Sequence, residues 1–330
     1  MSCRQAPGLG AAPSALDPDV RAMLALFENA GHPALQDLSP QDSRAAYAKS
    51  WRATQSRPVD VARVQDRLVE GPSGPLALRI YRPAGAVEGQ DLPAVLFIHG
   101  GGWVIGNLDS HDTMCRRLAN GACAVVVAVD YRLAPEHPFP AAVDDCAWAL
   151  RWLAQTHEAL CIDPSAVAVA GDSAGGNLAA VLALMARDGG LPPVVHQTLL
   201  YPVTDIAGEA PSYLQDRQAL PLTADTMRYF IGHYTPRAGD RLDWRASPLR
   251  APSVAGAAPA LVLTVGHDPL CDEGRSYARR LDEAGVRVCA VHLNDQVHGL
   301  FGLGRLLPAA DRLLDWMAGH IGSELRRAGS

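Results

Sequence analysis

The sequence has no apolar run long enough to cross a membrane, because its longest apolar stretches are strand-sized and interrupted by glycine, proline or charge. Residues 1–7 lack the continuous apolar core of a secretory signal peptide. The 29 basic and 35 acidic residues give a net charge of −6 and form no long run of one sign, so nothing marks a surface for nucleic acid. We therefore expect a cytoplasmic protein that binds neither nucleic acid nor membrane.

Paired cysteines are also absent. The seven cysteines are an odd number, lie far apart and include no Cys-x-x-Cys pair, which argues against a disulfide framework and against a zinc site. We expect no metal or cofactor, and we interpret most of the cysteines as small buried hydrophobic residues. They are Cys3, Cys115, Cys123, Cys146, Cys161, Cys271 and Cys289.

Apolar residues, by contrast, make up 48% of the 330 residues, enough for one large α/β domain or a domain with a modest insertion. Short apolar segments alternate with longer segments of helical periodicity, which predicts a mostly parallel sheet covered on both faces. The first two strands should form an antiparallel hairpin around the Gly/Pro-rich turn 71–75. The expected strands are 61–68, 76–81, 93–98, 124–129, a short strand at 167–170, 194–200, 260–265 and 286–293; the main helices are 110–120, 141–155, 174–188, 272–284 and 309–325.

The segment 167–180 carries the strongest chemical signal. Four small or β-branched residues are followed by Gly171-Asp172-Ser173-Ala174-Gly175 and then by an alanine- and leucine-rich helix. This strand, tight turn and helix are the context that a Gly-x-Ser-x-Gly nucleophile elbow requires. We predict that Ser173 is a nucleophile and that the Ala174 N–H faces an oxyanion beside it.

A second glycine-rich turn, His99-Gly100-Gly101-Gly102-Trp103, directly follows the strand ending at residue 98. Successive glycines let the backbone approach a ligand and turn its N–H groups towards it. We predict that Gly101 and Gly102 complete the oxyanion hole with Ala174. We interpret His99 as a positioner of this loop through backbone hydrogen bonds, and we expect Trp103, and Asp172 of the elbow, to bind substrate.

A serine nucleophile needs a base, and the base needs a carboxylate to orient it. In a fold of this kind the chain order is Ser, Asp or Glu, then His. Asp268 and His298 each follow a strand at its carboxyl end, so both are expected on the same rim as Ser173. His267 adjoins Asp268 in the same loop and His292 lies within a strand, so we consider both weaker candidates for the base.

Two regions stand outside the alternating pattern and are candidates for a cap. Helices are expected after Asp17-Pro18, ending at Gly31, and after Ser39-Pro40, both before the first strand. The second region, 203–259, contains a helical stretch over 223–234 and Pro-rich flanks. Inserted after a strand, it can fold over the carboxyl end of the sheet, where open α/β sheets bind ligands.

With these residues in place, the sequence resembles the hormone-sensitive-lipase-like family of α/β-hydrolases, which contains the bacterial family IV esterases. The resemblance covers residues 75–302 and rests on three motifs, at 99–102, 171–176 and 268–270. The segment 130–141 is also similar to a family signature, and we interpret it as a structural loop in which Arg132 and Glu136 pair within a buried turn. One departure is that Leu300, and not Phe301, comes first after the His-Gly pair.

The resemblance implies an α/β-hydrolase fold, a mostly parallel central sheet flanked by helices, with a two-part helical cap. We therefore divide the chain into N-terminal cap helices (1–55), the first part of the core (56–202), a cap insertion (203–247) and the second part of the core (248–330). It also implies a serine carboxylesterase acting on small esters of short- to medium-chain acids, and a possible homodimer. The alternatives are an amidase, lactone or carbamate hydrolase, or a non-catalytic small-molecule receptor on the same fold.

Overall fold

The computed structural model describes residues 15–214 and 220–328 and contains one eight-stranded sheet in the order β1-β2-β4-β3-β5-β6-β7-β8. Every strand expected from the sequence is present, with ends that differ by a few residues. The strands are β1 (Arg63–Gly71), β2 (Gly74–Arg82), β3 (Leu92–Ile98), β4 (Val125–Asp130), β5 (Ile162–Asp172), β6 (His196–Leu200), β7 (Ala260–His267) and β8 (Val288–Val297).

The expected hairpin and parallel sheet are both confirmed. β1 and β2 pair antiparallel up to Gly71 opposite Gly74, and β2 pairs antiparallel with β4. All further neighbours, from β4 to β8, pair parallel. Consequently the loops that follow β3, β5, β7 and β8 all leave the sheet at the same edge.

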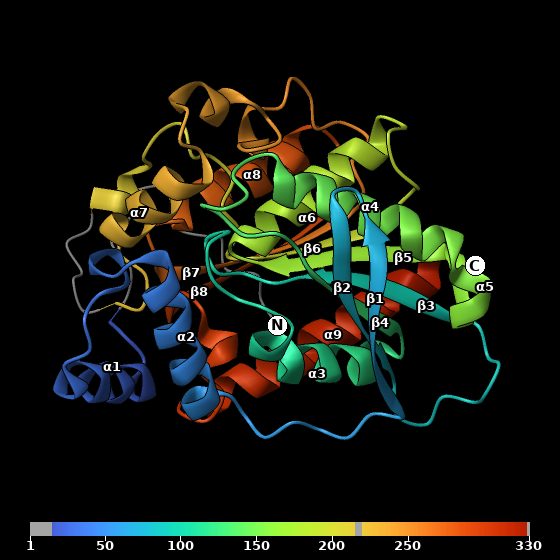
Figure 1. Cartoon of the computed structure of the whole chain (residues 1–330), viewed down its shortest axis with the longest axis horizontal. Helices are drawn as coiled ribbons and strands as arrows, with labels where there is room; N and C mark the ends of the chain where they lie inside the picture. The colour runs from blue at the N-terminus through green and yellow to red at the C-terminus, as the bar shows by residue number, and fades with distance from the viewer. Residues whose placement is uncertain (1–14, 215–219, 329–330) are drawn as a thin grey trace.

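Helices cover both faces of the sheet, as Figure 1 shows. α4 (Ala141–Gln155), α6 (Ala174–Arg187) and α8 (Cys271–Glu283) lie on one face, while α3 (Asp112–Ala122) and α9 (Pro308–Ala328) lie on the other. Alternate residues of β3 separate into the two cores: Leu96 and Ile98 face the first layer, and Val95 and Phe97 face the second. This two-sided burial explains why the central strands are continuously apolar.

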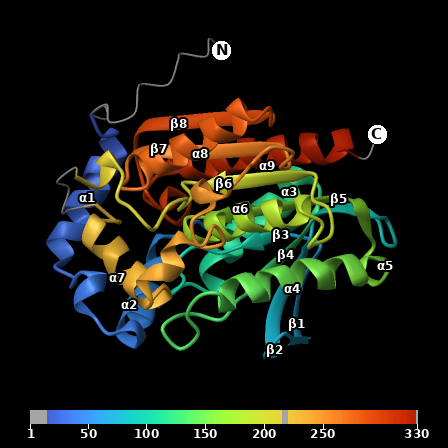
Figure 2. The same ribbon diagram turned by 90° about the horizontal axis from the view of Figure 1, so that it is seen from above.

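The remaining large helices, α1 (Pro18–Ala30), α2 (Pro40–Thr54) and α7 (Ala224–Tyr234), gather at one end of the sheet (Figure 2). Each begins at the N-cap side chain that the sequence favours there: Asp17, Ser39 and Thr223 accept hydrogen bonds from first-turn amides. The N-terminal segment and α7 are joined by hydrogen bonds, including one from the Thr226 hydroxyl to the Gln36 side chain at 2.8 Å.

The described residues also contain six 3₁₀ helices and a short helix, α5 (His157–Leu160), which were not expected from the sequence. β5 begins five residues earlier than the apolar run at 167. Among the described residues, no helix is long and apolar enough to cross a membrane. The prediction that most cysteines are buried is wrong for the six that the structure describes. Only Cys115, Cys146 and Cys271 are buried, while Cys123 is exposed; Cys3 lies outside the described residues.

The expected pairing of Arg132 with Glu136 is also wrong. Arg132 pairs with Asp145 of α4, whose carboxylate accepts both its backbone amide at 2.9 Å and its guanidinium at 2.8 Å. Glu136 instead pairs with Arg44 of α2 at 2.6 Å and is 54% exposed. The physical reason is that Asp145 is only 1% exposed. A buried carboxylate without a cation costs far more free energy than an exposed one, so Arg132 pairs with Asp145.

Candidate active site

The turn between β5 and α6 places Ser173 in a strained backbone conformation. Its φ of 55° and ψ of −118° lie outside the regions that non-glycine residues favour. The flanking glycines are required by close packing: a Cβ on Gly171 would meet the carbonyl of Gly175, and one on Gly175 would meet that of Ile98. This is the geometry of a nucleophile elbow.

Three loops distant in sequence meet at this serine. The Ser173 hydroxyl lies 2.9 Å from Nε2 of His298, and Nδ1 of His298 lies 2.8 Å from a carboxylate oxygen of Asp268. The three side chains are nearly inaccessible to solvent, and Asp268 is the most deeply buried. The arrangement can carry a proton from the hydroxyl to the imidazole while the carboxylate holds the imidazole in one tautomer.

Neighbouring groups hold the imidazole and the carboxylate in place. The Tyr201 ring packs against His298 with ring centroids 4.6 Å apart, and Phe301 stacks on Tyr201 with centroids 5.9 Å apart. The second oxygen of Asp268 accepts the Leu270 N–H at 2.9 Å. Both Leu300 and Phe301 are buried, so the reversed order after the His-Gly pair is accommodated by packing.

His292, one of the two weaker candidates for the base, has other partners. His292 in β8 contacts the Thr264 hydroxyl through one nitrogen and the Asn294 side chain through the other. Asp295 is the carboxylate nearest to His298 in sequence, and it accepts a hydrogen bond from the Gln296 side chain.

The glycine loop after β3 lies beside the elbow. Gly101 has φ 116° and Gly102 has φ 58°, both in the region that favours glycine. A Cβ on Gly101 would meet the carbonyl of Ile105, and one on Gly102 would meet the ring of Phe230 in α7. Among the described residues, no backbone partner accepts a hydrogen bond from the amide of Gly101, Gly102 or Ala174, so these amides can serve a developing oxyanion.

Trp103 and Asp172, which we expect from the sequence to bind substrate, both have partners within the protein. Trp103 is fully buried and stacks on Tyr234 of α7, with ring centroids 4.2 Å apart and an interplanar angle of 4°. The Asp172 carboxylate turns to the Gly100 N–H, at 2.8 Å, and to Nε2 of His111, at 3.1 Å. Trp103 therefore joins the glycine loop to α7, and Asp172 holds the start of that loop.

His99 has the geometry expected of a loop positioner. Its Nδ1 lies 2.8 Å from the Gly100 carbonyl, which can only accept, so this nitrogen carries the proton. The ring stacks on Tyr131 with centroids 4.3 Å apart. Burial, and secondarily the neighbouring His111, lower the pKa of His99 to about 3, which keeps its imidazole neutral.

Sequence reasoning missed His111 and the polar residues around it. His111 lies just before α3 and is 5% exposed. Its ring contacts the Ser110 hydroxyl, which in turn accepts the Asn107 N–H. A histidine at the start of an expected helix gives no sign of its partner, because Asp172 is 61 residues away along the chain. Within residues 15–214 and 220–328, no group of three His, Cys, Asp or Glu residues could hold a metal ion.

Comparison with known proteins gives one family and many relatives. Residues 95–302 match the family model described as alpha/beta hydrolase fold. The chain is similar to the esterase LipI of Mycobacterium tuberculosis, with 42% identity over 83% of this chain and 86% of that protein. It is also similar to an ethyl acetate hydrolase of Pseudomonas putida, with 38% identity over 90% of this chain and 95% of that protein.

Solved structures agree over nearly the whole chain. An ester hydrolase from the metagenome of Lake Arreo has a TM-score of 0.90 and 41% identity, covering 93% of this chain and 98% of that one. A thermostable esterase from Pseudomonas putida has a TM-score of 0.88 and 36% identity, covering 96% and 99%.

Proposed function

This chain belongs to the hormone-sensitive-lipase-like esterases of the α/β-hydrolase superfamily and is a carboxylic ester hydrolase; on that premise we propose that Ser173, His298 and Asp268 are its catalytic triad. The observation that carries the proposal is the continuous contact from hydroxyl to imidazole to carboxylate, at 2.9 and 2.8 Å. It is formed by residues 125 and 30 positions apart, which only the fold brings together.

In this mechanism Ser173 attacks the ester carbonyl while His298 accepts its proton. His298 then gives that proton to the leaving alcohol, and an acyl-enzyme remains. Water attacks the acyl-enzyme, again losing a proton to His298, and the acid leaves as Ser173 recovers its proton. Asp268 stabilises the imidazolium that forms in each half-reaction.

The negative charge that develops on the carbonyl oxygen is stabilised by backbone amides. We assign this role to Gly101, Gly102 and Ala174, whose positions beside Ser173 follow from the turn after β3 and the first residue of α6. Donors fixed before the reaction stabilise the tetrahedral intermediate without reorganising, and losing one such donor typically costs about 10²–10³ in kcat.

Replacing Ser173 by alanine tests the mechanism. Hydrolysis of p-nitrophenyl butyrate should fall by a factor on the order of 10⁶ in kcat, because a serine triad loses almost all of its function with its nucleophile. An unchanged circular dichroism spectrum would show that the fold is retained. Hydrolysis at the parental rate would refute the mechanism.

The same assay addresses the other activities that the triad could support. A parallel series with amide, lactone and carbamate substrates would show which bond the enzyme prefers, since the triad chemistry serves all of them. A non-catalytic receptor would hydrolyse none, and the hydrogen-bonded His298 argues against that role.

We also propose a small ester of a short- to medium-chain acid as substrate, and a cap formed by residues 1–55 and 203–247 over a core of 56–202 and 248–330. The packing of Phe230 and Tyr234 of α7 on the glycine loop supports this division. A cytoplasmic location and a homodimer complete the proposal; sedimentation equilibrium would give twice the 35.0 kDa chain mass for the dimer and the single mass for a monomer.

A further inference from the structure

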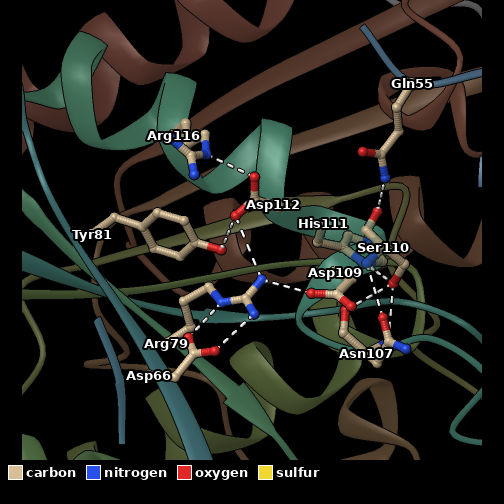
Figure 3. Close-up of polar contacts among 10 residues, drawn as sticks. All are labelled: Gln55, Asp66, Arg79, Tyr81, Asn107, Asp109, Ser110, His111, Asp112 and Arg116. Carbon is tan, nitrogen blue, oxygen red and sulfur yellow. Dashed lines mark hydrogen bonds and ion pairs between the residues drawn. The ribbon is translucent and has the colours of Figure 1, made fainter. Parts of the chain in front are cut away.

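A buried pair of side chains lies behind the elbow. The Asp172 carboxylate, 7% exposed, accepts the Gly100 N–H at 2.8 Å and faces Nε2 of His111 at 3.1 Å. His111 itself is 5% exposed, and its other nitrogen, Nδ1, lies 2.9 Å from the Ser110 hydroxyl. The serine, the histidine and Asn107 are drawn in Figure 3.

The other hydrogen bonds of the Ser110 hydroxyl show which atom is the donor in its contact with Nδ1 of His111. Its single proton goes to the Asn107 carbonyl at 2.8 Å, since a carbonyl can only accept. Its oxygen accepts the Asn107 N–H at 2.9 Å. The hydroxyl therefore has no proton left for His111, and the third contact must be donated by an N–H at Nδ1 of His111.

The carboxylate determines the proton at the other nitrogen. An ionised carboxylate only accepts hydrogen bonds, so Nε2 of His111 donates to Asp172. Burial opposes ionisation of Asp172, but His111 and the Gly100 amide hold the pKa of this carboxyl below its usual range. Both ring nitrogens of His111 thus carry protons.

We propose that His111 is an imidazolium ion whose pairing with Asp172 positions the oxyanion loop through the Gly100 N–H. The inference rests on the proposed function, because it gives the pair a role only through the amides of the next two glycines. His111 is a positioning residue and does not touch the substrate. Asp172 and Ser173 are adjacent in sequence, so one turn supplies both the nucleophile and the anchor of the loop opposite it.

The groups around the pair leave its two charges facing each other. Asp172 lies near several other titratable groups, and burial keeps each of them uncharged at neutral pH. It raises the pKa of the tyrosines and of the cysteine, and it lowers the pKa of His99. The acidic residues that flank His111 in sequence, Asp109 and Asp112, face Arg79 at 2.8 and 3.5 Å (Figure 3). The uncharged neighbours are Tyr47 of α2, His99 after β3, Cys115 of α3, Tyr131 after β4 and Tyr201 after β6.

The protonation state can be measured directly on the intact enzyme. Protein labelled with nitrogen-15 at its histidines should show, by NMR at pH 7, that both ring nitrogens of His111 carry protons. The signal is assigned to His111 by its loss in His111→Gln. A His111 ring with one protonated and one bare nitrogen at pH 7 would overturn the inference, whatever the kinetic results.

The positioning role predicts a specific kinetic pattern. His111→Phe, which keeps a ring and removes both donors, should lower kcat roughly 10- to 100-fold, because a small misplacement of oxyanion donors is expensive in the transition state. KM should change less than twofold, and affinity for a trifluoromethyl ketone analogue of the tetrahedral intermediate should fall with kcat. His111→Gln, whose amide can still donate to Asp172, should recover most of the loss.

The matched controls are His157→Phe and His157→Gln in α5, where the imidazole hydrogen-bonds the Ala154 carbonyl and lies outside the proposed site. These should leave kcat and KM unchanged. A folded His111→Phe enzyme with parental kcat, or a His111→Gln enzyme no better than His111→Phe, would refute the positioning role. Either result, combined with an inactive Ser173→Ala, leaves the triad intact, whereas an active Ser173→Ala refutes the triad itself.

Discussion

Asp172 and Ser173 are adjacent in the elbow, but their side chains contact different groups because the strained turn points them in different directions. Ser173 faces His298, while Asp172 faces His111 and the Gly100 amide. The positive φ at Ser173 is therefore part of the site.

At Asp268 we predict a loss of about 10⁴ in kcat for Asp268→Asn, because an amide stabilises the wrong imidazole tautomer and cannot balance the imidazolium. Steady-state hydrolysis of p-nitrophenyl butyrate provides the measurement. Asp295→Asn is the matched control: it changes a carboxylate three residues from His298 and should keep kcat within about twofold of the parent, since Asp295 is outside the triad. A drop of less than tenfold for Asp268→Asn would exclude it as the orienting carboxylate.

Asp130, at the end of β4, should make stability depend on pH. Burial is the main cause that raises the pKa of this carboxyl to about 6, against the opposing effects of the Leu108 amide and Arg79. The folded state therefore binds the proton more tightly than the unfolded chain, and stability falls as pH rises from about 4 to about 6. Asp130→Asn lacks this loss.

Urea denaturation of both proteins at pH 4 and pH 7 measures the effect. The stability of Asp130→Asn relative to the parent should increase by on the order of 1–3 kcal/mol between these two pH values. Contributions from other titrating groups cancel in the difference. A difference that does not vary with pH would contradict the assignment.

Sequence reasoning located the candidate triad residues because strand ends and glycine turns are local patterns. It did not locate the partners of Asp172 and Trp103. A buried carboxylate accepts hydrogen bonds from whichever donors the fold places beside it. For Asp172 one such donor is His111, which comes from another loop. A tryptophan beside a glycine loop can face the substrate or the cap, and only the position of α7 decides between them.

Between elements, the segment after β4 is held by two ion pairs of different kinds. Arg132 pairs with Asp145 of α4, which is almost completely buried, whereas Glu136 pairs with Arg44 of α2 at the surface. The first pair fixes α4 against the segment after β4. The second joins α2 to the same segment, together with the Arg44 hydrogen bonds to the carbonyls of Val104 and Ala134.

These two pairs should differ sharply in energy. Asp145→Ala removes a buried carboxylate that accepts the Arg132 amide and the partly exposed Arg132 guanidinium, and we expect a loss of about 3 kcal/mol in unfolding free energy. Glu136→Ala breaks a half-exposed pair, and we expect a loss of about 1 kcal/mol or less. Chemical denaturation of both variants gives the comparison, and equal losses would contradict the different burial of the two carboxylates.

The types of the strands and of the main helices were predictable because these elements are long and periodic enough to be recognised in the sequence. α4 begins and ends at the predicted residues, since Pro140 precedes it and its apolar face is continuous. β5 extends further back than its apolar run because it pairs with β3 as far as Ile162 opposite Leu92. Such extension depends on the neighbouring strand, which a single segment does not specify.

On the scale of the whole molecule, the helices of the proposed cap pack against the loops that carry the proposed triad and oxyanion amides. Phe230 of α7 lies against Gly102, and Asn177 of α6 donates to the carbonyls of Val203 and Ala246 at the two ends of the insertion. The insertion is thereby tied to the helix that begins at the nucleophile. Changes in the cap should therefore alter which acyl groups fit beside the oxyanion amides.

A series of p-nitrophenyl esters from acetate to laurate tests this. The parent should show its highest kcat/KM at short to medium chains and at least about a tenfold decrease by laurate, roughly the effect of losing one to two favourable methylene contacts. Phe230→Ala removes a ring beside Gly102 and should shift the maximum to longer chains. Leu242→Ala, at an exposed position of the same insertion, should leave the profile unchanged; a shift there, or none for Phe230→Ala, would contradict the cap's role.

The sequence by itself determined the sheet, the elbow, the glycine loop and the order of Ser173, Asp268 and His298, because these depend on local periodicity, glycine conformation and strand ends. Only the tertiary structure decided which groups meet across long chain separations: His111 with Asp172, Trp103 with Tyr234, and Arg132 with Asp145. The physical reason is that burial forces each polar or aromatic group to find a partner, but the identity of that partner depends on how distant elements pack.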